Sequence, residues 1–127
     1  MRMFVRTTKA QREAVALVRS ELAQRRYYIF PVAKWYRKHQ LDFLAVPRGE
    51  PQMLVLVRPL RNGSISVRPF AIPSWHESVR ALLRHLQPKL KTPVRWNSRQ
   101  LLHAKAQPDR WDQYLSAQSR REYARIS

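Results

Sequence analysis

Hydrophobic and polar positions recur along the chain with two periods, and these define the elements we expect. Apolar residues at helical spacing predict two helices, over residues 8–25 and 74–87. Short apolar runs bounded by turn residues predict strands at residues 27–33, 41–46, 53–60, 65–70 and 94–96. This order predicts an α/β domain with a central mixed sheet of four or five strands and one helix packed on each side.

Local signals set the ends of several elements. Thr7 or Thr8 is placed to cap the first helix, and Ser74 with Glu77 matches a capping box at the start of the second. The pair Asn62-Gly63 predicts a hairpin between the third and fourth strands. These signals keep the middle of the chain in one continuous αββββαβ unit.

The C-terminal third is expected to be helical at first and then to lose its structure. Ser98 is placed to cap a short helix, and Pro108 opens a last helix in which Trp111, Tyr114 and Leu115 pack inward. The apolar pattern fades after Gln118. We therefore expect a single domain over residues 1–118, made of a core at 8–96 and a helical extension at 97–118, followed by a basic tail at 119–127.

The balance of charged residues is the strongest overall signal in the composition. The chain has 25 Lys and Arg against 8 Asp and Glu, a formal net charge of +17, and 19 of its cations are arginines. Such a field attracts polyphosphates, and arginine adds bidentate phosphate contacts and stacking on bases. A GC-rich genome would explain the Arg to Lys ratio but not the net charge. We expect nucleic acid as the partner, with ribosomal RNA and anionic lipid as rival anions.

Other classes of function are disfavoured by composition. The absence of cysteine excludes disulfides and thiolate metal sites, and two glycines exclude a Gly-rich phosphate loop. The four histidines lack metal-binding spacing. No apolar run approaches the roughly 20 residues of a membrane span, and residues 1–13 lack the apolar region of an export signal. A cytoplasmic protein without membrane partner is expected.

A basic aromatic segment follows the first predicted strand. Its residues alternate cations with aromatic rings, namely Lys34, Trp35, Tyr36, Arg37 and Lys38. This composition suits stacking on unpaired bases combined with phosphate contacts. The alternative is a hairpin whose aromatic rings cover the core while its cations are only solvated.

Two charged residues interrupt the apolar strands. Asp42 lies in the second predicted strand, and Arg58 lies near the end of the third. Asp42 is either a metal ligand or the partner of a salt bridge with a neighbour such as Arg58. Glu21, within the apolar arc of the first helix, is interpreted as paired with one of the many arginines.

With these residues in place, the chain resembles the PD-(D/E)XK nuclease superfamily, and within it the small group I intron homing endonucleases. The matching segments are QREAVALVRSELAQRR, YYIFPV, LDFLAV and VLVRPLRNGSISV. The resemblance implies a restriction-endonuclease-like αβββαβ core. It also implies that Asp42 binds Mg²⁺, that Arg58 replaces the lysine orienting the attacking water, and that Glu13 is the helical acid. A homo-oligomer is implied as well, joined through residues 27–30 or the C-terminal helix.

The sequence departs from the nuclease motif at two positions. Leu56 stands where a second carboxylate is expected and has no oxygen for a metal, and Arg58 cannot become a neutral base. We therefore expect a nucleic-acid-binding protein on a degenerate, catalytically inactive scaffold. Its expected ligand is structured RNA, such as a group I intron, whose folding or splicing it assists. The alternative is an active Mg²⁺-dependent DNA endonuclease, with Glu50 moving in as the displaced carboxylate; otherwise no cofactor is expected.

Phosphate contacts are expected from arginines and lysines on several elements. The expected residues are Arg37, Lys38, Arg58, Arg61, Arg80 and Arg84, with Arg120, Arg121 and Arg125 as a loose C-terminal tether. Binding through them would weaken steeply as salt is added.

Overall fold

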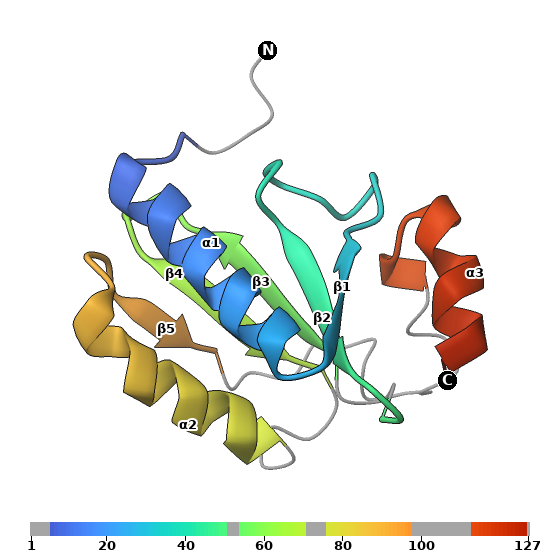
Figure 1. The fold of residues 1–127 in the computed structure, drawn as a ribbon. Coiled ribbons are helices and arrows are strands. Elements are labelled where there is room, and N and C mark those ends of the chain that lie inside the picture. Colours follow the sequence, from blue (N-terminus) through green and yellow to red (C-terminus); the bar gives the residue numbers. More distant parts are fainter. Residues whose placement is uncertain (1–5, 51–53, 71–75, 98–112, 127) are drawn as a thin grey trace.

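A computed structural model describes residues 6–50, 54–70, 76–97 and 113–126 (Figure 1). Its helices are α1 (Lys9–Gln24), α2 (Glu77–Leu86) and α3 (Ala117–Ile126), and the 3-10 turn η2 (Gln87–Lys89) extends α2. Its strands are β1 (Tyr27–Pro31), β2 (Phe43–Pro47), β3 (Val55–Pro59), β4 (Ile65–Pro69) and β5 (Val94–Trp96). The predicted order of elements is confirmed through β5, and the short helix predicted after Ser98 lies outside the described residues.

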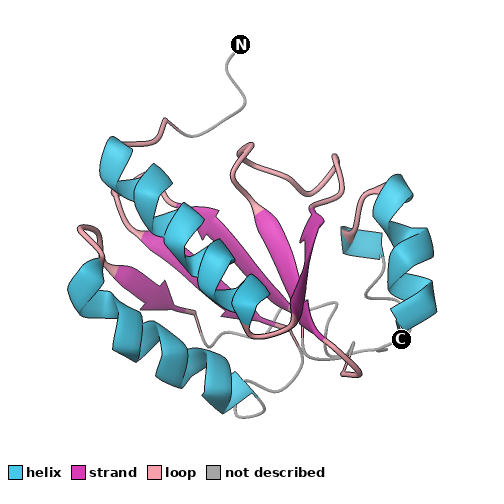
Figure 2. Cartoon of the chain, viewed as in Figure 1, coloured by secondary structure: helices cyan, strands magenta, loops and turns pink. Residues whose placement is uncertain are grey.

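The strands form one mixed sheet in the order β1-β2-β3-β4-β5 (Figure 2). The first four are antiparallel neighbours, whereas β5 runs parallel to β4 after the chain crosses over through α2. The predicted hairpin joins β3 to β4, and its Gly63 has a φ of 90°, a conformation that favours glycine. The chain is thus an α/β protein with a five-strand mixed sheet.

Each of the first four strands ends at a proline. These are Pro31, Pro47, Pro59 and Pro69. Because proline has no backbone N–H, it cannot donate to a sheet ladder and stops the strand there. Pro31 lies on the edge strand β1, as its position in the sequence indicated.

Both faces of the sheet are covered, but by different helices than the sequence analysis expected. One core contains apolar side chains of α1 and α2 packed on inward-facing residues of β2, β3 and β4, such as Phe43 and Val57. The opposite core contains Leu44 and Leu56 from the same strands, packed against C-terminal residues that include Tyr114. The expectation of α1 and α2 on opposite faces was therefore wrong; both lie on one face, and the C-terminal segment covers part of the other.

The predicted basic tail is also corrected, because residues 117–126 form the helix α3. Tyr123 is buried there, and its ring lies 6.3 Å from that of Phe30 in an edge-on contact. Just before α3, Tyr114 and Leu115 are fully buried as predicted, but Leu115 forms an isolated β-bridge with Val32 and is not part of a helix as expected. Trp111, the third residue expected to pack inward there, lies outside the described residues. A single aromatic side chain thus secures a helix whose other described side chains are mostly polar.

The start of α1 is tied to the β3–β4 hairpin by one buried polar side chain. Thr8 and Gln11 form a reciprocal capping box, which confirms Thr8 as the cap. The Gln11 Nε2 atom also donates to the carbonyls of Leu60 (2.7 Å) and Ser64 (2.8 Å). Ser74, expected to cap α2, lies outside the described residues, and His76 occupies the cap position without a side-chain hydrogen bond.

Replacing Gln11 by leucine is expected to lower the free energy of unfolding by about 2 kcal/mol. The substitution removes the side-chain donor from two hairpin carbonyls, which keep only their backbone donors from Gly63 and Leu60, and it removes half of the capping box. Each hydrogen bond lost in this way costs roughly 0.5–1.5 kcal/mol. Urea unfolding measures the loss. Exposed Gln24, at the other end of α1, provides the control, and a Gln24→Leu change of equal size would contradict the role of Gln11.

Candidate functional site

The two charged residues singled out in the strands form a buried ion pair. Asp42 lies directly before β2, and Arg58 lies within β3, the neighbouring strand. The Arg58 Nη2 atom is 3.1 Å from Asp42 Oδ2, and the side chains are 9% and 0% exposed. The salt-bridge interpretation of Asp42 is therefore confirmed, as is the pairing of Glu21, which contacts Arg25 at 2.8 Å.

The ion pair fixes the backbone of the basic aromatic segment. Asp42 Oδ2 accepts hydrogen bonds from the amides of Lys38 (2.7 Å) and His39 (3.1 Å). Arg58 Nη2 donates to the carbonyl of Tyr36 at 3.2 Å, and its guanidinium carbon lies 5.0 Å from the centre of the Tyr36 ring. The pair thus holds the loop that carries Tyr36 and Lys38 against the sheet.

Burial shifts the pKa values of both partners in the direction that favours their neutral forms. It raises the pKa of the Asp42 carboxyl, although the attraction of Arg58 and the backbone hydrogen bonds oppose this shift. It lowers the pKa of the Arg58 guanidinium, with Asp42 opposing and the nearby charge of Arg68 adding to the decrease. An arginine begins so far above neutral pH that Arg58 stays charged at pH 7, and its charge favours the ionised form of Asp42.

The donor set around Asp42 does not fit a magnesium ion. Asp42 Oδ2 is already occupied by Arg58 and two amides, and Oδ1 is buried without a partner among the described residues. Leu56 is buried in the apolar core of its face. Glu13 lies elsewhere, beside Lys9 and in a small pocket with Lys89 and Lys91. Mg²⁺ needs several hard oxygen ligands, and this site offers one orphaned oxygen.

A groove of about 810 Å³ opens on the sheet face away from α1 and α2. We call it the cationic groove. It is lined by Tyr36, Lys38, Leu56, Arg58, Pro59, Leu60, Arg61, Ser66, Arg68 and Asn97. Four of these residues are cations and none is acidic, and Asp42 compensates only Arg58. The charge available to a ligand therefore comes from Lys38, Arg61 and Arg68.

An aromatic cluster stands beside this groove. The Trp35 ring lies 5.3 Å from that of Tyr36 and 5.6 Å from that of Tyr114, and Tyr114 makes an edge-on contact with Phe70 at 4.9 Å. Burial, together with Tyr36, raises the pKa of Tyr114 to about 12, so this phenol adds no negative charge near the groove. Trp35 is 61% exposed and is the exposed large hydrophobic residue of the described chain.

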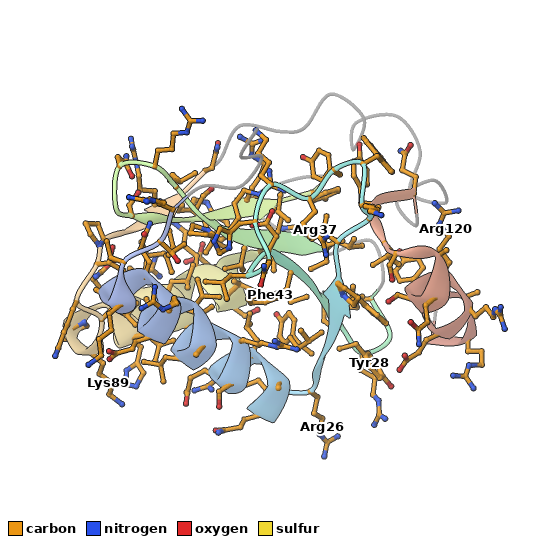
Figure 3. All side chains as sticks on the ribbon, turned by 90° about the horizontal axis from the view of Figure 1, so that it is seen from above. Arg26, Tyr28, Arg37, Phe43, Lys89 and Arg120 are labelled. Carbon is orange, nitrogen blue, oxygen red and sulfur yellow. The ribbon has the colours of Figure 1, made fainter. Side chains whose placement is uncertain are left out.

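The remaining predicted contacts are spread over other surfaces. Arg80 and Arg84 lie on α2 and line a smaller pocket of about 210 Å³ with Trp96, on the helix-covered face, where Arg84 also pairs with Glu77 at 3.0 Å. Exposed Arg120 and Arg121 lie on α3. In Figure 3, Arg37 and Arg120 lie away from α1, whereas Lys89 lies on the α1 and α2 side.

Arg68 and Asn97 are among the groove residues that were not predicted from the sequence. Arg68 alternates with Ile65 and Val67 on β4, which places it on the opposite face from those two core residues. Asn97 follows β5 and donates its amide to the Val67 carbonyl at 2.9 Å. The alternation in residues 65–70 was a usable signal for Arg68, whereas the position of Asn97 depends on the parallel pairing of β5.

Comparisons with known proteins assign the chain to no family. No protein-family model, curated protein or solved structure matches the chain. In the described ranges no helix has the length and apolarity to cross a membrane. Nor do His, Asp or Glu side chains there gather in threes that could hold a metal ion.

Proposed function

We propose that the protein binds nucleic acid, without cutting it, through the cationic groove. The observation that carries this proposal is the lining of the groove, which joins Lys38, Arg61 and Arg68 on one face with no acidic residue among them. Phosphate oxygens are the ligands that such donors recognise, and Arg61 and Arg68 can bind them bidentately. The net charge of +17 adds long-range attraction.

RNA is the proposed ligand class, because an exposed aromatic ring beside the groove suits bases that are not already paired. The degenerate restriction-endonuclease-like scaffold is proposed on two observations. These are the order of helices and strands and the contact of Asp42, directly before β2, with Arg58 on the adjacent strand β3. The narrower idea of a group I intron, whose folding or splicing the protein assists, rests on the sequence resemblance alone.

Binding measured across a salt series tests the proposal. If Lys38, Arg61 and Arg68 each neutralise one phosphate, the slope of log K against log salt is expected to be about −2 to −3. Filter binding with a labelled structured RNA gives this slope. A slope near zero would show that phosphate contacts do not carry the binding.

Metal dependence separates the binder from the endonuclease alternative. Because Asp42 is held by Arg58 and two amides, chelation with EDTA is expected to leave RNA affinity unchanged, and Mg²⁺ or Mn²⁺ is expected to support no cleavage of duplex DNA. Gel assays on supercoiled plasmid check the second expectation. Metal-dependent nicking that disappears in an Asp42→Asn variant would instead establish the nuclease.

A further inference from the structure

We propose that Trp35 is a stacking platform for one unpaired nucleotide, so that the ligand of the cationic groove is an RNA with a single-stranded or bulged segment. This inference rests on the proposed function and specifies its substrate class. It is carried by the exposure of Trp35, by the contacts that hold its ring in place, and by its position relative to the groove.

The Trp35 ring is exposed but not loose. Its Nε1 atom donates to the carbonyl of Gln113 at 3.1 Å, and two neighbouring rings, of Tyr36 and Tyr114, contact it at tilted angles of 57° and 36°. Behind it, Ala33 donates its amide to the Tyr114 carbonyl at 2.6 Å, which joins the loop to the C-terminal segment. A ring already fixed in this way loses little further rotamer freedom when a base stacks on it.

Tyr36 connects the platform to the groove. Its ring contacts Trp35 on one side and the Arg58 guanidinium, 5.0 Å away, on another, and it also packs edge-on against Tyr114 at 4.8 Å. Tyr36 is therefore engaged by protein groups, whereas more than half of the Trp35 surface is open to solvent. Trp35, and not Tyr36, is the ring available to a base.

The cations are placed for a strand that runs from the platform into the groove. Exposed Lys34 and Lys38 flank the two aromatic residues in sequence, and Lys38 lines the groove with Arg61 and Arg68. The bases of an intact duplex stack on one another and offer no free face within the helix, whereas a single strand offers one at every nucleotide. The combination of one aromatic platform and a run of cations therefore selects an unpaired segment.

The test compares three RNAs of equal phosphate number at one salt concentration, namely a single strand, a perfect duplex and a duplex with one bulged nucleotide. Wild-type protein is expected to prefer the single strand and the bulge. Trp35→Ala is expected to weaken binding of these two by about 5- to 150-fold, the range for stacking one base on an aromatic ring, and to leave the duplex nearly unchanged. Trp35→Phe is expected to retain most of the affinity.

Two further variants keep the outcome interpretable. Trp35→Met keeps a long apolar side chain without an aromatic face, so it replaces the alanine variant if the latter does not fold. A variant with Lys38, Arg61 and Arg68 changed to glutamine is expected to weaken all three RNAs alike. Failure of that variant to change any affinity would contradict the proposed function itself.

The inference is overturned on its own if the cation variant weakens binding while Trp35→Ala and Trp35→Met behave as wild type toward the single strand. That result would indicate that the exposed Trp35 ring contacts a protein partner and not an RNA base. Equal weakening of duplex and single strand by Trp35→Met would also overturn it, because the ring would then support the groove instead of reading an unpaired base.

Discussion

Replacing Asp42 by alanine is expected to lower the free energy of unfolding by about 3–5 kcal/mol, since removing one partner of a buried ion pair leaves the other charge uncompensated. Arg58 would be left buried beside Arg68, and the amides of Lys38 and His39 would lose their acceptor. Denaturant unfolding followed by circular dichroism measures the change. RNA affinity is expected to fall as well, because the pair holds the loop of Tyr36 and Lys38.

The chain contains a matched control for this experiment. Glu21 and Arg25 form an ion pair of similar length, 2.8 Å, but on the solvent-accessible surface of α1. Glu21→Ala is therefore expected to cost less than about 1 kcal/mol. The double variant Asp42→Leu with Arg58→Met is expected to recover part of the loss, because the uncompensated charge is gone. A double variant as unstable as Asp42→Ala alone would show that the two amides, and not the charge, dominate.

Changing Lys38, Arg61 and Arg68 together to glutamine is expected to weaken RNA binding on the order of 1000-fold, at roughly 1.5 kcal/mol for each charged hydrogen bond lost. The salt slope is expected to fall by about 2. Filter binding at several salt concentrations measures both quantities, and thermal unfolding confirms that the variant is folded.

The control for this variant removes the same charge from the other face. Arg19, Arg80 and Lys89 are exposed residues of α1, α2 and η2, on the helix-covered face, and they lie outside the groove. Their triple glutamine variant is expected to lose only the small long-range component of the attraction. Equal losses in the two variants would mean that net charge alone, and not the groove, determines binding.

The sequence predicted the elements well because each depends on local chemistry. Helical spacing located α1 and α2, and Thr8 and Asn62-Gly63 located a cap and a hairpin. It did not predict which face each helix covers, since β2 and β3 are buried on both faces and their apolar runs carry no direction. The α3 helix was missed because, among its side chains that the structure describes, Tyr123 is the one large apolar group in the core.

The candidate site was predicted less completely. The contact of Asp42 with Arg58 was one of two alternatives that the residues allowed, and the structure distinguishes them. Arg80 was grouped with Arg61 because both are exposed cations, yet they lie in different pockets. Alternation indicates that Arg68 lies opposite Ile65 and Val67, but which cations share a groove also depends on sheet order and on which face each helix covers, and local periodicity encodes neither.

The prolines that end β1 to β4 also protect the alignment of the sheet. In the β3–β4 hairpin, Pro59 is paired with Ile65 at one end of the ladder, and Pro69 is paired with Val55 at the other end. A slip of one residue along the neighbouring strand would exchange the two buried faces, and a slip that moves these prolines inward would place a residue without an amide proton within the ladder. On the edge strand β1, Pro31 similarly opposes the addition of a strand from another molecule. A chain with such apolar strands thereby resists both misalignment during folding and edge-to-edge aggregation.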